Sequence, residues 1–475
     1  MTKGIGWRSW YYAGSAALTL SFPLFCRWCG DANIPPQKAF ARFWINLIFL
    51  NLLLAYLLFF QKTNKIKIVT RSEWILFAAA GLFLCVLPPV FSGDLHEYLM
   101  RGRILGVYHE NPYLVPREYP GDPFYSLTTW VSLNKLPENY GPVWACIEWI
   151  VPTIFRHSYF ASIFFFKALL FSFLAGAVWF FDRICREMSP AHAHWLVPFF
   201  ALNPNLINHT LIDGHNDIVM VFWSLGAFYF LLKNRYARAV AAATLAVLVK
   251  FTTVIFLPLT GIFYFRGLKE PSVGKFLGIT AKSLAIFAAI CFAFYLPFWT
   301  GASPLSYFSM FMSNWFYSNS VPYAFYMILN RLGLEVSQDA VKHFFMFFFA
   351  ANCLLAFIWL WAKKNLAPRD FCRAASWIFL AMYSSYPIPF YGHHLLWALP
   401  FLILAEFPAP LLWNLLYTAV GLFFYFKRPS FLFLAGFVLY SGYLLFAYFA
   451  VKAGRKSLDS PVKKSYNKAS FWENL

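Results

Sequence analysis

A cluster of ionisable side chains follows one of the long apolar segments of this 475-residue chain. It occupies residues 92–103, SGDLHEYLMRGR, and contains two carboxylates, a histidine and two arginines. Only 12% of the chain is charged. Charged groups beside an apolar segment that can enter a membrane are costly to hold, and they are kept mainly where they serve a function. The cluster is therefore the first candidate for a functional site.

A helix over residues 94–103 would place four of these side chains on one face: Asp94, Glu97, Tyr98 and Arg101. A carboxylate that is partly shielded from water there has a raised pKa and is suited to general-base chemistry, which makes Asp94 the candidate base. Arg101 and Arg103 are suited to binding a phosphate. The alternative is structural, with Asp94 as the helix N-cap and Glu97 in a capping box. A helix cap does not account for the presence of Arg101 and Arg103.

A second polar cluster lies in the turn expected between two apolar segments, at residues 211–217. Its ionisable groups are Asp213, His215 and Asp217. Three ionisable groups in a tight turn can line a sugar or a metal pocket, and His215 and Asp217, together with Glu97, are candidates for binding a substrate. The alternative is a solvated turn in which Asp217 caps the following helix.

Two further sites carry cationic groups in apolar surroundings. His393 and His394 are adjacent at the expected start of a helix, where they can donate to a phosphate with help from the helix N-terminus. Lys250 lies between two short apolar segments and must extend to the interface, pair with an anion or serve a site. We expect Lys250 and one histidine of the pair to contact an anionic group. The alternative for either histidine is a packed or capping residue.

The elements that position these residues are apolar helices. The chain is 60% hydrophobic and 22% aromatic, more apolar surface than a soluble domain can bury. Apolar stretches of roughly 17–25 residues, the length that a bilayer requires, recur throughout the chain. We expect membrane segments at 10–27, 41–60, 74–92, 159–181, 195–212, 216–232, 278–298, 340–362, 374–390, 411–426 and 430–451, and shorter apolar pieces at 141–155, 239–250, 251–265 and 395–406. This pattern predicts an all-α polytopic membrane protein with about 11–14 transmembrane helices.

The net charge of +19 is located in short connections and in the tail, so it does not indicate a nucleic-acid partner. Basic loops mark the cytoplasmic side, and a polybasic tail suits an anionic leaflet. The basic connections are at 61–73, 182–190, 233–238, 266–275 and 363–373. This assignment places Asp94 on the extracytoplasmic face of a multi-pass protein of the cytoplasmic membrane. It requires residues 141–155 to enter the outer leaflet without crossing it, and residues 239–265 to form two short helices that meet near Lys250.

The positions of the expected loops divide the chain into four parts. We expect N-terminal transmembrane helices at 1–73, a catalytic transmembrane module at 74–298 with a large outer loop at 92–140, a C-terminal transmembrane module at 299–451 with an outer loop at 299–335, and a basic cytoplasmic tail at 452–475. The first outer loop is rich in Pro, Gly, Tyr and Asn, which predicts short helices and turns.

Cysteine spacing and motifs predict no cofactor. Cys26 and Cys29 form a CxxC, for which a disulfide or redox role stays open, but no second pair completes a zinc site. The chain has no P-loop, no HExxH motif and no GxGxxG motif after a strand. We expect no metal ligand set, while a requirement for a divalent metal stays open.

Several motifs, taken in order, resemble one known family. They are GDLHEYLMRGRILGVYHENPYLVP, NYGPVW, ALNPNLINHTLIDGHND, AVLVKFTTVIFLP and YGHHLLWALPFLI, within residues 90–405. The chain resembles the GT-C superfamily of polyprenol-phosphate-sugar-dependent glycosyltransferases, particularly the α-mannosyltransferases of bacterial envelopes. The resemblance implies a membrane bundle, a catalytic acid in the first large outer loop that matches Asp94, a lipid-linked donor and inversion at the sugar carbon.

Three departures from the family pattern are visible. Many relatives carry a second acidic residue directly beside the first, whereas the nearest one here is Glu97. NYGPVW replaces the more usual Tyr-Pro-Pro stretch, and three helices rather than one are expected before Asp94. These differences bear on the subfamily and on the sugar rather than on the general class.

The sequence thus predicts an inverting enzyme that moves a hexose, mannose by resemblance, from a polyprenyl-phosphate donor to a lipid or glycan acceptor of the envelope. Its partners would be that donor, that acceptor and membrane lipids, with no nucleic acid. The alternative is a polytopic transporter or flippase of a lipid-linked or anionic substrate, which should show repeated halves and a polar site at the bilayer midplane. A non-catalytic scaffold would tolerate neutral changes at Asp94 and Arg101.

Overall fold

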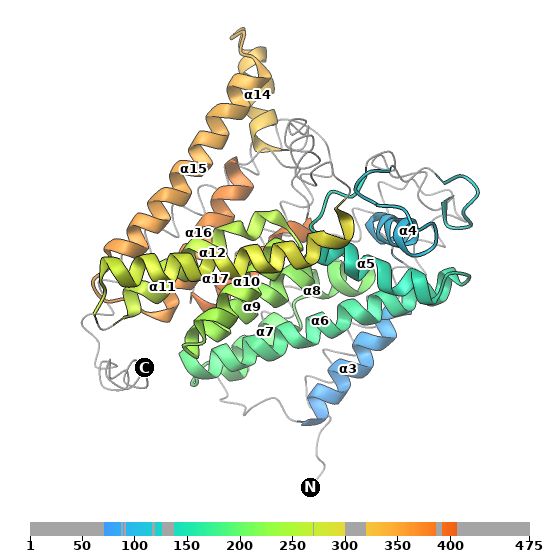
Figure 1. Ribbon diagram of the computed structural model, residues 1–475, viewed down its shortest axis with the longest axis horizontal. Helices are drawn as coiled ribbons and strands as arrows, with labels where there is room; N and C mark the ends of the chain where they lie inside the picture. The colour runs from blue at the N-terminus through green and yellow to red at the C-terminus, as the bar shows by residue number, and fades with distance from the viewer. Residues whose placement is uncertain are drawn as a thin grey trace. The chain divides into compact units, whose positions relative to one another are not determined.

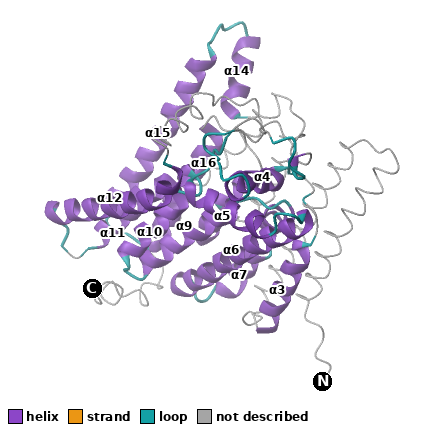
Figure 2. Cartoon of the chain, turned by 45° about the vertical axis from the view of Figure 1, so that its right-hand side comes forward, coloured by secondary structure: helices purple, strands orange, loops and turns teal. Residues whose placement is uncertain are grey.

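Helices form the regular structure of the described part of the chain. The computed structural model describes residues 71–405, except for 87–88, 90–91, 116–118, 126–136, 269, 300–319 and 386–391. Figure 2 draws helices and loops and no strand over these residues. The all-α class predicted from the sequence is confirmed for this part of the chain.

The chain divides into two compact units between Val219 and Met220, within helix α9 (Asp217–Leu232). The modules predicted above follow the loops of the sequence, and their boundaries stay a prediction. The predicted segments 10–27, 41–60, 411–426 and 430–451, the tail and the Cys26–Cys29 pair lie outside the described residues.

The first unit contains the two polar clusters singled out from the sequence. Its described elements are α3 (Arg71–Cys85), α4 (Asp94–Gly106), α5 (Pro142–Ile154), α6 (Tyr159–Met188), α7 (Ala193–Ala201), α8 (Pro204–Ile207) and the π-helix η2 (Asn208–Ile212). In Figure 1, α6 runs alongside α7, and it also packs on η2. Ser158 starts α6 by accepting a hydrogen bond from the Ala161 amide at 3.3 Å.

The sequence predicted one continuous segment at 195–212, and this prediction is wrong. The structure breaks it into α7, α8 and η2. Pro204 cannot donate a backbone hydrogen bond, and it disfavours a helical conformation at Asn203. The Asn203 side chain restarts the helix by accepting from the Asn205 amide at 3.0 Å. The break leaves polar side chains in the middle of an apolar stretch.

Helices α4 and α5 pack at close range because α4 carries a glycine at their contact. A Cβ placed on Gly102 would lie 2.0 Å from the Glu148 carbonyl oxygen of α5, so only glycine permits this approach. Trp144 of α5 is fully buried in the same region. This packing fixes α4, the helix that begins with Asp94, against the rest of the unit.

The second unit holds the remaining described elements. After α9 come α10 (Tyr236–Val247), the 3₁₀ helix η3 (Phe251–Ile255), α11 (Phe256–Gly267), α12 (Val273–Tyr295), η4 (Leu296–Phe298), α14 (Val321–Arg331), α15 (Gln338–Ala362), α16 (Pro368–Ser385), η5 (Gly392–Trp397) and α17 (Leu399–Leu404). Lys250 lies between α10 and η3, so the predicted pair of short helices meeting near this residue is confirmed.

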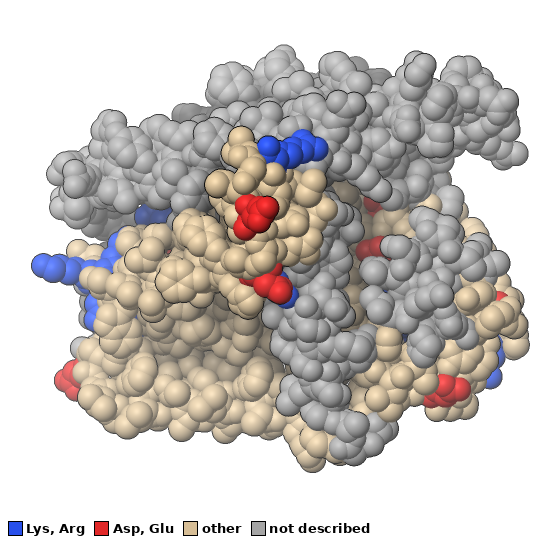
Figure 3. Space-filling view, turned by 90° about the horizontal axis from the view of Figure 1, so that it is seen from above, with Lys and Arg blue, Asp and Glu red and all other residues tan. Residues whose placement is uncertain are grey.

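Among the described helices, three elements are long and apolar enough to cross a membrane: α6, α12 extended through η4 to Phe298, and α15. Apolar side chains of α12 face outward, with Leu284 62% and Phe292 66% exposed, as expected for a helix that contacts lipid. The face in Figure 3 shows few charged side chains among its described atoms. The chain is an all-α polytopic membrane protein, while the total number of its spans stays a prediction.

Candidate functional site

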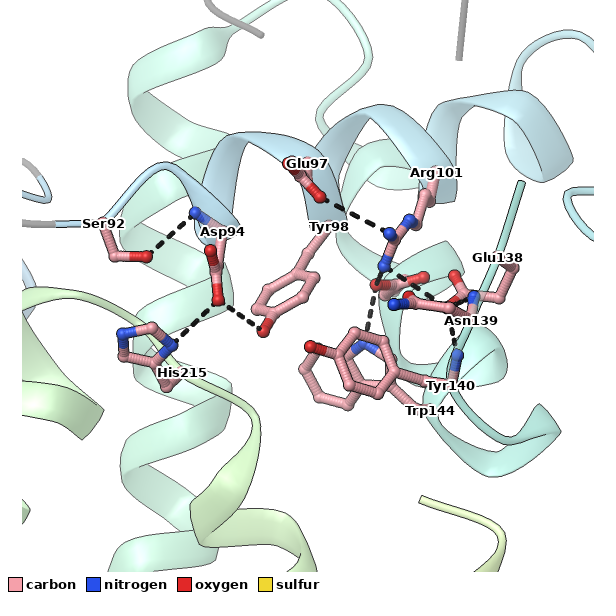
Figure 4. A network of polar contacts seen from close by, with 11 residues as sticks. Ser92, Asp94, Glu97, Tyr98, Arg101, Glu138, Asn139, Tyr140, Trp144 and His215 are labelled. Atoms are coloured by element: carbon pink, nitrogen blue, oxygen red, sulfur yellow. Dashed lines mark hydrogen bonds and ion pairs between the residues drawn. The ribbon is translucent and has the colours of Figure 1, made fainter. Parts of the chain in front are cut away.

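Asp94 is the first residue of α4, and its side chain is available for chemistry. Gly93 occupies the N-cap position, and the Asp94 amide donates to Ser92 Oγ at 3.1 Å (Figure 4). The N-cap residue itself makes no side-chain hydrogen bond to the helix. The capping-box alternative, with Asp94 as the cap, is therefore wrong.

The Asp94 carboxylate is held from two directions. Its Oδ2 atom lies 3.1 Å from His215 Nδ1 and 3.5 Å from the Tyr98 hydroxyl, which donates to it (Figure 4). The Asp94 side chain remains 31% exposed, whereas that of His215 is only 3% exposed. The hydrogen-bond partners of this carboxylate are buried, while the carboxylate itself is partly exposed. This is the arrangement expected of a general base that must reach a proton of the substrate.

His215 reaches Asp94 because the chain turns sharply after η2. The Asp213 amide donates to the Asn208 carbonyl at 3.0 Å, and the His215 amide donates to the His209 carbonyl at 2.9 Å. Gly214 adopts φ +74°, a conformation that favours glycine, and it packs against Leu95 of α4. The turn is thus seated on the first turn of α4.

Charge around His215 favours its imidazolium form. Burial alone would lower the pKa of His215, but the nearby Asp94 carboxylate, supported by Asp213 and Asp217, raises it above its ordinary value. His209 lies near both Asp213 and His215. Its Nδ1 atom is 3.6 Å from Asp213 Oδ2, and its ring centroid is 5.7 Å from that of His215. The solvated-turn alternative for this segment is wrong, because Asp213, His215 and Asp217 are all buried.

Tyr98 stays a hydrogen-bond donor to Asp94. Burial, together with Tyr140 and Asp94, raises the pKa of Tyr98 well above its ordinary value, so the phenol keeps its proton. The Tyr98 ring packs edge-on against Trp144 at 4.9 Å and Tyr140 at 5.9 Å. These aromatic contacts fix the hydroxyl toward the carboxylate.

Arg101 lies in a buried network of carboxylates. Its guanidinium contacts Glu97 at 3.4 Å, Glu138 at 3.3 Å and Glu148 at 4.0 Å (Figure 4). Burial would lower the pKa of Arg101, but Glu138, Glu97 and Glu148 more than compensate and raise it. Only 2% of the residue is exposed. The geometry therefore favours positioning of α4 and α5 over the phosphate contact predicted for Arg101, and over the substrate contact predicted for Glu97.

Arg103 is also engaged within the protein. Its Nε donates to Asp122 at 2.7 Å, and its NH1 donates to the Arg156 carbonyl at 2.6 Å. The guanidinium lies 4.2 Å from the centre of the Phe124 ring. These contacts tie the outer loop to α4, and the geometry favours this role over the phosphate contact predicted for Arg103.

The second unit brings together two sites that are far apart in sequence. Lys250 Nζ lies 5.3 Å from the centre of the Trp397 ring, and the His394 ring is 4.6 Å from the same tryptophan. His393 packs edge-on against His394 at 4.5 Å, and Tyr383 donates to the His394 carbonyl at 2.6 Å. Lys250 and His393 are buried. Lys250, His393 and His394, which were predicted to contact an anion, therefore belong to one cluster that includes Trp397.

Sequence reasoning missed several buried charged residues of the first unit. Glu138 and Glu148 complete the network around Arg101, and Trp144 Nε1 donates to Glu148 at 2.6 Å. Lys167 is fully buried within α6 and lies in the electrostatic field of Asp213. A single ionisable residue in an apolar stretch is the signal that pointed to Lys250, and the same signal would have found Glu148 and Lys167.

Comparison with known proteins connects this site to a family. Residues 14–266 match the family model described as "Alpha-(1->6)-mannopyranosyltransferase, N-terminal domain". The chain is 28% identical over 221 residues to alpha-(1->6)-mannopyranosyltransferase A of Mycobacterium tuberculosis, covering 44% of this chain and 41% of that protein. The protein of the same name from Corynebacterium glutamicum is 28% identical over 204 residues, or 41% of each chain.

The matched region contains both Asp94 and His215, and the chain spans about two fifths of the length of these relatives. The matches confirm the resemblance to GT-C α-mannosyltransferases that was identified from the motifs. Since the family model covers more than half of the chain, the protein belongs to the alpha-(1->6)-mannopyranosyltransferase family.

Proposed function

We propose that the protein is an inverting mannosyltransferase that uses a polyprenyl-phosphate-mannose donor and works on the extracytoplasmic face of the cytoplasmic membrane. The acceptor is a glycolipid or glycan of the envelope. Family membership supports the sugar, and the relatives' names support an α-(1→6) linkage. The observation that carries the proposal is the partly open Asp94 carboxylate, held by His215 at 3.1 Å and by Tyr98 at 3.5 Å.

Asp94 acts as the general base. It removes the proton from an acceptor hydroxyl while that oxygen attacks the anomeric carbon of the donor sugar. The bond from the anomeric carbon to the phosphate oxygen breaks, and its electron pair leaves with polyprenyl phosphate. The leaving group is a stable anion, so cationic contacts serve it better than a general acid.

The second unit, taken by itself, carries a cluster of cationic groups around Trp397 that is suited to an anion. Lys250 and His394 both contact Trp397, and His393 packs against His394. A lysine and imidazoles can bind a phosphate through charge-assisted hydrogen bonds. His215 orients Asp94 and favours its ionised form. Asp217, buried next to this turn, supports the same arrangement.

The proposal is tested by transfer of radiolabelled mannose from polyprenyl-phosphate-mannose in vesicles, with envelope-lipid extracts as acceptors. Wild type should transfer label, and Asp94→Asn should lose about 10²–10⁴-fold in turnover, the usual contribution of a general base. Asp339→Asn is the matched control, because Asp339 is an exposed carboxylate in the first turn of α15. This control should transfer label as wild type does.

Each other outcome is informative. Transfer by Asp94→Asn at the wild-type rate would keep the enzyme class and remove Asp94 as the base. Absence of transfer by folded wild-type protein from either mannose or glucose donors would contradict the function itself.

A further inference from the structure

Buried polar side chains without partners concentrate in one short segment beside Asp94. Within residues 203–216, four side chains carry a buried nitrogen or oxygen that has no hydrogen-bond partner among the described residues. These atoms are Asn203 Nδ2, Asn208 Nδ2, Thr210 Oγ1 and both amide atoms of Asn216. Native proteins leave few buried polar groups unpaired, so this concentration requires an explanation.

The segment is folded so that one of its residues, His215, contacts the candidate base. The backbone hydrogen bonds from Asp213 to Asn208 and from His215 to His209 close the chain into a compact π-turn. Asn216 directly follows His215, whose imidazole contacts Asp94, and Asn216 is fully buried at the start of the 16-residue helix α9.

The chemistry of the unpaired groups indicates a neutral, hydroxyl-rich ligand. Three of the four side chains are amides, which donate through nitrogen and accept through oxygen, and the fourth is a hydroxyl, which does both. A sugar hydroxyl likewise donates and accepts, so it matches such groups. Since these side chains carry no charge, they match hydroxyls better than they match a phosphate.

We propose that Asn208, Thr210 and Asn216 form the subsite that binds the hydroxyl groups of the transferred hexose and selects among sugars. This inference rests on the proposed function, because the sugar must lie near Asp94 for transfer. The amide nitrogen of Asn203, which has no partner among the described residues, extends the same polar segment. Buried water is the competing occupant, since internal waters also satisfy such groups.

The test measures discrimination between sugars. Wild type, Asn216→Ala and Asn208→Ala are assayed in vesicles with polyprenyl-phosphate-mannose and with donors whose mannose lacks a single hydroxyl. Asn352→Ala is the matched control, because Asn352 is a buried asparagine of α15 whose amide donates to the Phe348 carbonyl and accepts from Trp377. The readout is the ratio of kcat/KM for the full donor to that for each deoxy donor.

Wild type and Asn352→Ala should prefer the full donor over at least one deoxy donor. In Asn216→Ala or Asn208→Ala that preference should fall by about 10-fold. In wild type, a donor that lacks the hydroxyl leaves the asparagine amide unpaired, whereas in the alanine variant no amide is present to be left unpaired. If an alanine variant does not fold, Asn216→Asp keeps the size and the acceptor while removing the amide donor, and it should lose the same preference.

Unchanged preference in all folded variants would overturn the inference and assign the polar groups to internal water, while the proposed function would stand. Absence of mannose transfer by wild type would overturn the proposed function and this inference with it. The two failures are therefore distinguished by the wild-type measurement.

Discussion

The carboxylate of Asp94 depends on a histidine from a distant part of the chain. His215 is buried, its Nδ1 atom lies 3.1 Å from Asp94, and its pKa is raised because the surrounding carboxylates outweigh the effect of burial. A raised pKa in the folded state means that the folded protein binds this proton more tightly than the unfolded chain does. The pair therefore contributes stability below the ordinary histidine pKa, and this contribution is lost as the pH rises through the raised value.

Replacement of His215 by Gln should show this dependence. The loss of melting temperature relative to wild type in detergent should be larger near about pH 6 than near about pH 9, because the imidazolium form is lost at the higher pH. His157→Gln is the control, since His157 is exposed in the turn before α6. An equal loss at both pH values would show that the pair makes no charge-dependent contribution.

At the scale of elements, the buried network around Arg101 connects α4 to the loop before α5 and to α5 itself. Glu97 belongs to α4, Glu138 to the loop and Glu148 to α5, and all three carboxylates contact one guanidinium. The backbone amides of Asn139 and Tyr140 donate to Glu138 at 2.9 Å and 2.8 Å, which orders the loop. The network explains how the helix that begins with Asp94 is held in place.

Removing the arginine should destabilise these elements together. Arg101→Met leaves the buried carboxylates of Glu97 and Glu138 without their cation, which should cost about 3–5 kcal/mol of unfolding free energy. Arg186→Met is the matched control, because Arg186 pairs with Asp182 on α6 at 2.7 Å but is 46% exposed, and such a pair contributes at most about 1 kcal/mol. Unfolding in detergent measures both, and equal losses would contradict a structural role of the network.

At the scale of the whole molecule, the placement of loops relative to the membrane follows from the distribution of basic residues. Short basic connections, such as residues 233–238, are expected in the cytoplasm, and the loop at 92–140 is expected outside. The proposed activity on the extracytoplasmic face depends on this orientation.

Labelling of single cysteines tests the orientation. In a chain whose eight cysteines are replaced by serine, Glu110→Cys should react with a membrane-impermeant maleimide in intact cells, while Lys233→Cys should react only after lysis. Both positions are exposed in the structure, so access to the reagent depends on the side of the membrane. The reverse pattern would place Asp94 in the cytoplasm and would contradict the proposed site of action.

The sequence by itself determined the class of the protein and indicated candidate residues for its chemistry. Apolar length predicted the long helices, and polar residues in an apolar chain pointed to Asp94, His215, Lys250 and the His393–His394 pair. These signals can be read from short stretches of sequence, because an ionisable residue within or beside an apolar stretch is costly to hold near lipid. The motif order also led to the correct family.

Only the tertiary structure decided which residues meet. It paired Asp94 with His215, and it surrounded Arg101 with three carboxylates. It also broke the expected segment 195–212 at Pro204 and left the buried amide groups of Asn208 and Asn216, in the segment that contains His215, without partners among the described residues. The partner of a buried charge depends on segments brought together by packing, and no local pattern records that choice. Arginine is equally suited to a phosphate and to a carboxylate, so the contact alone reveals its role.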